Sequence, residues 1–279
     1  MINADASQVY RDLAILSARP TDTEMGGVDH RLFGHVDGAD DYNAARWAND
    51  AKAEMASAHS QGAASILVGG TGMYIRTLLE GIAPVPDIDP AIRERIRSYP
   101  VEQQYEELQR VDGDAATRLK PRDTTRIARA LEVALSTGKP LATWQEQRVG
   151  GINGLVSLTP QILLPPREEL KLRCDARFEI MLNQGAAIEV EQLLTRGLSP
   201  EKPVMRAIGV PEIAAMLEGR LTREEAIAGG QLATRQYAKR QYTWFRNQLP
   251  GDWPRFNTLL NSENVSQLAI LLRDNMLTG

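Results

Sequence analysis

The feature that most constrains the fold is a short apolar segment followed by a glycine-rich turn and a helical segment. Residues 65–68 (Ser-Ile-Leu-Val) are typical of a buried strand, residues 69–72 (Gly-Gly-Thr-Gly) of a tight turn, and residues 73–80 of an amphipathic helix. Residues 41–61, which precede the strand, have apolar side chains at helical spacing behind an aspartate-rich start. The order helix, strand, glycine turn, helix indicates an α/β fold with a parallel sheet, because a helix usually supplies the crossover between parallel strands.

The rest of the chain is mostly helical and divides at a cluster of prolines within residues 83–90. Asp89-Pro90 is a typical N-cap and first-turn pair for a helix at 90–97, and further helices are predicted at 105–111 and 122–137. We therefore predict a first part of the α/β core at 1–90, an all-helical insertion at 91–148, and a second, mostly helical part of the core at 149–279. In the last part we expect a strand at 157–164 that returns to the sheet, and helices at 167–182, 188–196, 211–217, 223–227 and 232–249.

Composition and charge exclude several classes of protein. The 279 residues carry a net charge of −4, which excludes an overall basic coat for nucleic acid but leaves room for a local basic patch. The single cysteine, Cys174, cannot form an internal disulfide, so we expect a reducing, cytoplasmic location. The histidines lack zinc-ligand spacing, and we expect no metal held by protein ligands alone. Apolar runs are far shorter than the roughly 18 residues of a membrane helix, and residues 1–10 do not resemble a signal peptide. For the oligomeric state, we expect a monomer.

The first residues place a carboxylate where a strand ends. Residues 1–4 are typical of the last part of a strand, and Asp5 follows directly. Ligand sites in parallel α/β sheets lie at the carboxyl ends of strands, where Asp5 would be able to accept a proton. The alternative is an ordinary turn or capping aspartate. Because a domain rarely begins with the end of a strand, we expect further upstream elements to belong to this fold.

The turn at 69–72 is a candidate phosphate site. Glycines allow close approach of a ligand, amides at a helix N-terminus attract phosphate, and the Thr71 hydroxyl is placed to donate to a leaving-group oxygen. The alternative is a tight connection without a ligand. Arg177 would either bind an anion or pair with Asp175 or Glu179. The sequence Gly138-Lys139-Pro140 is not a phosphate loop, because it has neither the Ser/Thr nor the upstream glycine.

Arginines and lysines gather on two predicted helical regions. In the insertion, Arg93 and Arg97 are one turn apart, and Arg122, Arg126 and Arg129 share a face. Residues 226–249 contain several cations and no acidic residue, and Arg235, Lys239, Tyr242 and Arg246 fall on one face of that helix. Cations with an interleaved aromatic ring suit an RNA backbone and a stacked base. The alternatives are a solvated helix face in the insertion, and arginines paired with distant carboxylates at 226–249.

Five segments in this order resemble the tRNA dimethylallyltransferases. They are Asn3-Ala4-Asp5-Ala6-Ser7-Gln8-Val9-Tyr10, Val68-Gly69-Gly70-Thr71-Gly72-Met73-Tyr74, residues 123–133, residues 206–212 and residues 233–246. The resemblance implies transfer of a dimethylallyl group from dimethylallyl diphosphate to N6 of adenosine 37, beside the tRNA anticodon. It also implies a P-loop-kinase-like α/β core with a helical insertion, and Mg²⁺ accompanying the diphosphate.

The resemblance assigns roles to individual residues. Asp5 is the general base, and Thr71 assists the departing diphosphate, which we also expect Gly70 and Arg177 to bind. We expect Arg235 and Lys239 to add to the tRNA contacts that the resemblance implies. Those implied contacts are Asp5, Ala6, Ser7, Gln8, Arg93, Thr125, Arg126, Ile127, Ala128, Arg129, Arg206, Ala207, Ile208, Gly209, Val210 and Pro211.

Two departures from the family pattern affect the expected activity. Family members carry a Gly-x-Thr-x-x-Gly-Lys-Ser/Thr loop about 20–25 residues before the aspartate motif, and this chain begins after that point. Ala6 also stands where the family usually has serine. We therefore expect weak donor binding, with a catalytically impaired tRNA-binding remnant as the alternative function. An isopentenyltransferase acting on free adenylates is a narrower alternative, which the cationic helices disfavour.

Overall fold

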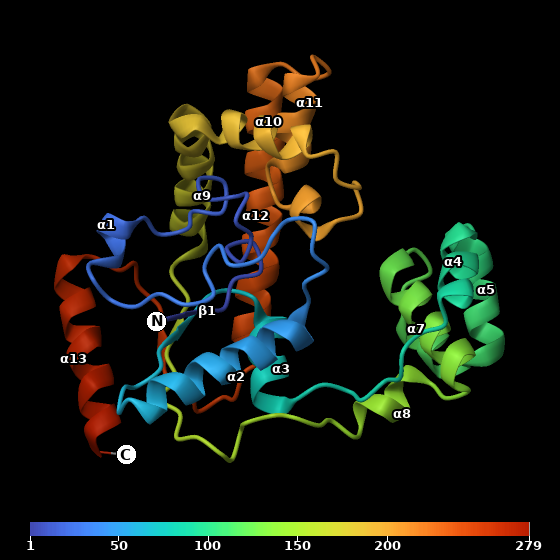
Figure 1. The fold of residues 1–279 in the computed structure, drawn as a ribbon, viewed down its shortest axis with the longest axis horizontal. Coiled ribbons are helices and arrows are strands. Elements are labelled where there is room, and N and C mark those ends of the chain that lie inside the picture. The colour runs from blue at the N-terminus through green and yellow to red at the C-terminus, as the bar shows by residue number, and fades with distance from the viewer. Residues whose placement is uncertain (279) are drawn as a thin grey trace. The chain divides into compact units, whose positions relative to one another are not determined.

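The computed structural model describes residues 1–278 and divides the chain into two compact units (Figure 1). The first unit combines residues 1–76 with the chain from 154 onward, and the second comprises residues 77–153. The insertion predicted at 91–148 lies within the second unit. None of the helices described at 1–278 is both long and apolar enough to cross a membrane.

Two small parallel sheets lie in the first unit. Strand β1 (Ile2–Asn3) pairs with β2 (Leu67–Val68), with Ile2 opposite Leu67. Strand β3 (Ile162–Leu163) pairs with β4 (Arg255–Phe256). The predictions of strands at 1–4 and 65–68 and of parallel pairing are confirmed. The prediction that 157–164 returns to the first sheet is wrong, because residues 254 and 256 accept the hydrogen bonds from the amides of Ile162 and Leu164.

Helices account for most of the first unit. A short helix, α1 (Asp22–Met25), was not predicted. The α-helices that follow it in this unit, up to residue 217, have bounds close to the predicted ones. The helical elements after α1 are α2 (Ala44–Ser60), α3 (Gly72–Glu80), α9 (Arg167–Met181), the π-helical turn Leu182–Ala186, α10 (Ala187–Thr195), the 3₁₀ turn Pro203–Arg206, α11 (Val210–Leu217), α12 (Arg223–Asn247) and α13 (Ser262–Thr278). Helix α3 begins in the first unit and ends in the second.

The prediction of separate helices at 223–227 and 232–249 is wrong, because α12 runs unbroken through Gly229 and Gly230. Helix α9 packs along α12 (Figure 1). A Cβ atom added at Gly230 would lie 1.9 Å from Cζ of Phe178 on α9. The glycine therefore serves close helix packing and does not end the helix.

Buried aromatic side chains hold the β1–β2 sheet against its helices. Trp47 of α2 is fully buried and stacks on Tyr74 of α3 with ring centroids 4.6 Å apart. Its indole nitrogen donates a hydrogen bond to the Asn3 carbonyl oxygen at 2.8 Å. The buried Asn3 side chain in turn donates to the carbonyl oxygens of Leu32 and Asp5, each at 3.0 Å. These contacts fix the end of β1, where Asp5 begins.

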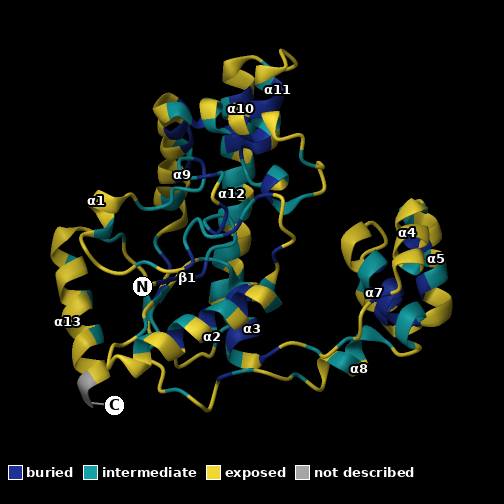
Figure 2. Cartoon of the chain, in the orientation of Figure 1, coloured by how far each residue is buried: buried dark blue, intermediate teal, exposed yellow. Residues whose placement is uncertain are grey.

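The second unit has a helical core of its own. Its helices are α4 (Pro90–Ser98), α5 (Val101–Val111), α6 (Gly113–Arg118), α7 (Thr124–Thr137) and α8 (Leu141–Gln145). Ile96, Leu108, Ile127 and Leu131 are fully buried where these helices face one another (Figure 2). The predicted cap of α4 is confirmed, because the Asp89 side chain accepts a hydrogen bond from the Ala91 amide at 2.8 Å.

Candidate active site

The sheet brings Asp5 and Thr71 together from distant parts of the sequence. Because β1 and β2 are adjacent and parallel, their carboxyl ends lie at the same edge of the sheet. The Thr71 amide donates to the Ala4 carbonyl oxygen at 3.1 Å. The Thr71 hydroxyl oxygen accepts a hydrogen bond from the Ala6 amide at 2.9 Å. The threonine is therefore attached to the backbone on both sides of Asp5.

One oxygen of the Asp5 carboxylate is engaged and the other is available. Oδ1 accepts a hydrogen bond from the Ser7 amide at 2.8 Å. This bond is typical of a turn aspartate, the alternative role considered for Asp5 from the sequence. Among the described residues, none donates a hydrogen bond to Oδ2. The Asp5 amide donates to Oδ1 of the buried Asn3 at 2.8 Å, which fixes the backbone from which the carboxylate projects.

The glycine turn is packed too closely to carry side chains. A Cβ atom added at Gly69 would lie 2.2 Å from the Ala4 carbonyl carbon, and one at Gly72 would lie 2.4 Å from the Trp244 ring. The side-chain amide of Gln241 donates to the Gly70 carbonyl oxygen at 2.9 Å. The turn is therefore held between the end of β1 and helix α12.

Tyr237 of α12 faces this pair, and sequence reasoning did not single it out. Burial raises the pKa of Tyr237 and the Asp5 carboxylate raises it further, while the Thr71 and Gln241 side chains lower it through contact with the hydroxyl. Burial likewise raises the pKa of Tyr10 to about 12. Both phenols are therefore protonated at neutral pH, and the hydroxyl of Tyr237 is a hydrogen-bond donor beside Asp5 and Thr71.

A small cavity of about 80 Å³ lies beside Asp5. Arg177 of α9 is its one cationic lining residue, and Asp5 is its one carboxylate. Burial raises the pKa of the Cys174 thiol at this wall, which keeps the thiol protonated and unreactive. The lining consists of Asp5, Ser7, Leu13, Leu16, Ser17, Cys174, Arg177, Phe178, Met181, Ala207, Ile208, Thr234 and Tyr237. The predicted residues Asp5, Ser7, Arg177, Ala207 and Ile208 thus meet at one cavity.

Glu189 of α10 anchors the loop that supplies Leu13, Leu16 and Ser17 to the cavity. Its carboxylate accepts hydrogen bonds from three consecutive amides, those of residues 14, 15 and 16, at 2.5, 3.0 and 2.9 Å. The sequence around Glu189 does not predict this anchoring role, because the three amides that it binds lie more than 170 residues away in the sequence.

Several residues predicted to bind tRNA are engaged in ion pairs. Nη1 of Arg235 lies 2.6 Å from Asp175 of α9, which is the pairing with a distant carboxylate that the sequence left open. Arg206 is exposed and lies 3.4 Å from Glu201. Lys239 is exposed on α12. In the second unit, Arg126 lies 3.4 Å from Asp123 at the start of α7.

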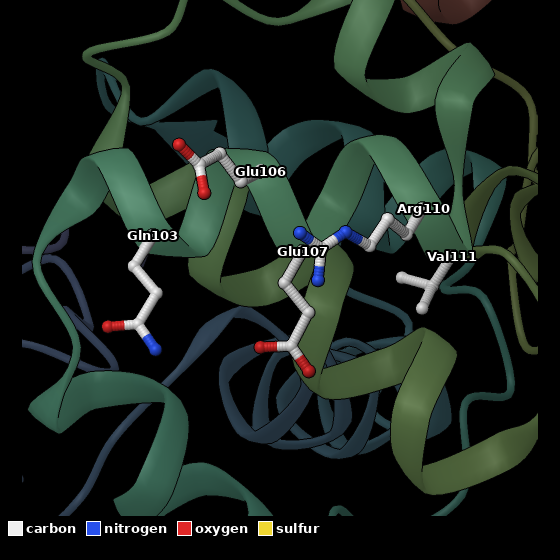
Figure 3. Close-up of a pocket in the computed structure, with 5 residues that line it drawn as sticks. All are labelled: Gln103, Glu106, Glu107, Arg110 and Val111. Carbon is white, nitrogen blue, oxygen red and sulfur yellow. The ribbon is translucent and has the colours of Figure 1, made fainter.

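The second unit also has an open hollow along one helix. Gln103, Glu106, Glu107, Arg110 and Val111 line it, and Figure 3 shows that all five project from α5. Three of these side chains carry charges of mixed sign, and the structure brings no residue of the candidate site into the hollow. It has no arrangement of groups that indicates catalysis.

Comparison with known proteins gives a consistent result. The family model described as IPP transferase matches residues 8–248. The tRNA dimethylallyltransferase of Sphingopyxis alaskensis is 61% identical over 278 residues, covering 100% of this chain and 91% of that protein. The one of Novosphingobium aromaticivorans is 59% identical, covering 98% of this chain and 97% of that protein.

Two solved structures have a similar fold. A eukaryotic dimethylallyltransferase acting on tRNA has a TM-score of 0.80 and 29% identity, covering 99% of this chain and 72% of that chain. The full-length tRNA isopentenylpyrophosphate transferase of Bacillus halodurans has a TM-score of 0.66 and 29% identity, covering 98% of this chain and 88% of that chain.

Proposed function

Because the chain belongs to the IPP transferase family, we propose that it transfers a dimethylallyl group from dimethylallyl diphosphate to N6 of adenosine 37 in tRNA. The observation that carries this proposal is the meeting of Asp5 and Thr71, 66 residues apart in the sequence, at one edge of the β1–β2 sheet, where Asp5 lines the cavity. A buried, reduced cysteine supports a cytoplasmic location, and we expect the enzyme to act as a monomer with a P-loop-kinase-like core.

Asp5 is proposed as the general base. An exocyclic adenine amine is a poor nucleophile, because its lone pair is delocalised into the ring. A carboxylate that accepts the amine proton as the C–N bond forms removes this obstacle. Oδ1 of Asp5 is held by the Ser7 amide, which leaves Oδ2 to take the proton without loss of orientation.

Thr71 is proposed to assist departure of the diphosphate. Its hydroxyl oxygen already accepts a hydrogen bond from the Ala6 amide, and its own proton, which faces the Tyr237 hydroxyl, would turn to a diphosphate oxygen when the donor binds. The allylic carbon tolerates cationic character, and the main task is to stabilise the negative charge that develops on the leaving group. The Gly70 backbone, next to Thr71 in the glycine turn, and the guanidinium of Arg177, which lines the cavity, are the further groups that we assign to the diphosphate.

Magnesium is expected to arrive with the diphosphate. Mg²⁺ is usually held by one or two carboxylates together with substrate phosphates and water. The described residues contain no group of three histidine, cysteine or acidic side chains able to hold a metal ion, and Asp5 alone brings a carboxylate to the cavity. These residues do not form a dedicated magnesium site, and we assign no step to the ion.

The tRNA is proposed to reach Asp5 with its target base unstacked. Unstacking costs a few kcal/mol and less in a loop than in a duplex. We assign residues 5–8 and 206–211 to the nucleotides nearest the cavity, because both segments contribute to its wall. Lys239, Arg235, Arg93, Thr125, Arg126, Ala128 and Arg129 are assigned to the rest of the anticodon arm, with Arg235 shared between RNA and Asp175. Ile127 is not assigned to the tRNA, because its side chain is fully buried in the core of the second unit.

The test is to map the product. The protein is incubated with labelled dimethylallyl diphosphate and unmodified tRNA, and the digested tRNA is analysed by mass spectrometry. We expect N6-dimethylallyl adenosine at position 37, and no label in a tRNA with guanosine there or in free AMP. The resemblance implies that a Gly-x-Thr-x-x-Gly-Lys-Ser/Thr loop binds the diphosphate. The assay is therefore repeated with a second form of the protein that carries such a segment before Met1.

Each other outcome contradicts the proposal in a different way. Label in free AMP and none in tRNA would identify an adenylate isopentenyltransferase. Binding of tRNA with no transfer by either form would identify a tRNA-binding remnant.

A further inference from the structure

Three guanidinium groups in the second unit converge on one buried carboxylate. The Glu132 side chain on α7 is 2% exposed. Nε of Arg97 lies 2.9 Å from its Oε1, while Nε of Arg93 and Nη1 of Arg129 lie 3.8 and 3.7 Å from its Oε2. The side chains of Arg93, Arg97 and Arg129 are 46%, 61% and 42% exposed, so all three reach solvent. We call Arg93, Arg97 and Arg129 the arginine cluster.

Local geometry brings the cluster together. Arg93 and Arg97 are one turn apart on α4, and Arg129 is three residues before Glu132 on α7. The two helices pack through Ile96 and Leu131, which are fully buried. A buried carboxylate is stable only when it is paired and hydrogen-bonded, so Glu132 holds the arginines at fixed positions.

The charges in the cluster do not balance. Three cations share one carboxylate, which leaves an excess of two positive charges in a protein whose net charge is −4. Each guanidinium has five N–H donors, and among the described residues the cluster makes one hydrogen bond to Glu132, from Nε of Arg97 at 2.9 Å. By contrast, Arg95 on the same helix lies 3.9 Å from Glu107, one carboxylate for one cation.

We propose that Glu132 gathers the arginine cluster into a receptor for RNA backbone phosphates, in which Arg97 binds phosphate and Glu132 is a positioning residue. Planar guanidinium groups with free donors match phosphate oxygens in pairs. Phosphate contacts orient a protein on its RNA without reading sequence, which suits a unit with no catalytic groups. This inference rests on the proposed function, which supplies the RNA, and it adds Arg97 and Glu132 to the expected contacts.

The first test compares two arginines on one helix. Binding of an unmodified anticodon stem-loop RNA to the full chain is measured over a series of salt concentrations. Arg97→Gln is expected to weaken binding and to reduce the slope of log K against log[salt] by about 0.7–1, as loss of one phosphate contact requires. Arg95→Gln removes the same charge from the same helix and is expected to keep the wild-type slope. Equal slopes for the two variants would overturn the assignment of Arg97.

The second test separates positioning from neutralisation. Glu132→Gln removes a negative charge, so simple electrostatics would tighten RNA binding. If Glu132 positions the arginines, binding weakens severalfold in spite of the added positive charge. Tighter or unchanged binding would overturn the positioning role. Binding is measured well below the melting temperature of the variant, and a variant that does not fold leaves the Arg97 comparison as the deciding test.

Failure of this inference is distinguishable from failure of the proposed function. A wild-type protein that modifies tRNA, with Arg97→Gln equal to Arg95→Gln in slope, overturns only the phosphate receptor. A wild-type protein that neither binds nor modifies tRNA overturns both.

Discussion

Replacement of Gly230 by alanine tests how α12 is held against α9. The added Cβ would lie 1.9 Å from Cζ of Phe178 and 2.4 Å from two other atoms of that ring. These distances are far inside van der Waals contact, and Phe178 is itself 3% exposed and unable to move into solvent. Either the ring or the helix must shift, and overpacking of this kind costs about 1–3 kcal/mol.

Gly229 provides the matched control for the same change. It precedes Gly230 in the same helix, and a Cβ there would meet Glu212 Cγ at 3.1 Å, a contact that a small side-chain adjustment relieves. Both substitutions gain about 0.5–1 kcal/mol of helix propensity. The difference between the two variants therefore isolates packing, and we expect Gly230→Ala to be less stable than Gly229→Ala by about 1–3 kcal/mol.

The assay is urea unfolding of both variants, followed by far-ultraviolet circular dichroism. Equal midpoints and slopes for the two variants would refute the reasoning, because they would mean that the ring does not occupy the space beside Gly230. A second readout is the environment of Trp244, which packs on Gly72 from the same helix. Its fluorescence is expected to change in Gly230→Ala and to stay as in wild type in Gly229→Ala.

Two further substitutions test other parts of the first unit. Because the Glu189 carboxylate accepts from three amides of the loop at 14–16, Glu189→Gln is expected to lower the free energy of unfolding in urea by about 1.5–3 kcal/mol, and an unchanged value would remove its anchoring role. Burial lowers the pKa of His35, beside the Tyr42 hydroxyl at 3.1 Å, in spite of the nearby Asp50 carboxylate. The unfolded chain then binds more protons than the folded one as pH falls below about 6.5, so stability decreases there. That decrease between pH 7.5 and 5.5 should be smaller in His35→Asn than in wild type, and an equal decrease would contradict the assignment.

Local patterns predicted the part of the fold that depends on neighbours in sequence. The cap at Asp89, the helix that follows Gly72 and the strand at 67–68 all have signals within a few residues. The meeting of Asp5 with Thr71 agrees with one rule, that adjacent parallel strands end at the same edge of a sheet. Chemistry at strand ends is therefore accessible to sequence reasoning.

Interactions between distant segments were not accessible in this way. The strand at 162–163 was predicted, but its partner at 255–256 was not, because the residues around Arg255 and Phe256 contain prolines and polar residues and no alternating apolar run. The break predicted in α12 falls at Gly229 and Gly230, where the close packing of Gly230 on Phe178 outweighs the low helix propensity of glycine. The Arg97–Glu132 pair joins residues 35 positions apart, and the Arg235–Asp175 pair joins residues 60 positions apart. Spacing along the chain carries no information about which cation meets which carboxylate.

The most direct measurement compares the single-turnover rate of dimethylallyl transfer with the affinity for tRNA in Asp5→Asn. The asparagine keeps an oxygen for the Ser7 amide and loses the ability to accept a proton. We predict a rate at least about 100-fold below wild type, as loss of a general base requires, with tRNA affinity unchanged. Asp29→Asn, which removes the same charge at a side chain 84% exposed, should retain both. Undiminished transfer by Asp5→Asn, or a loss of tRNA binding that accounts for its slower rate, would contradict the assignment of Asp5 as the base.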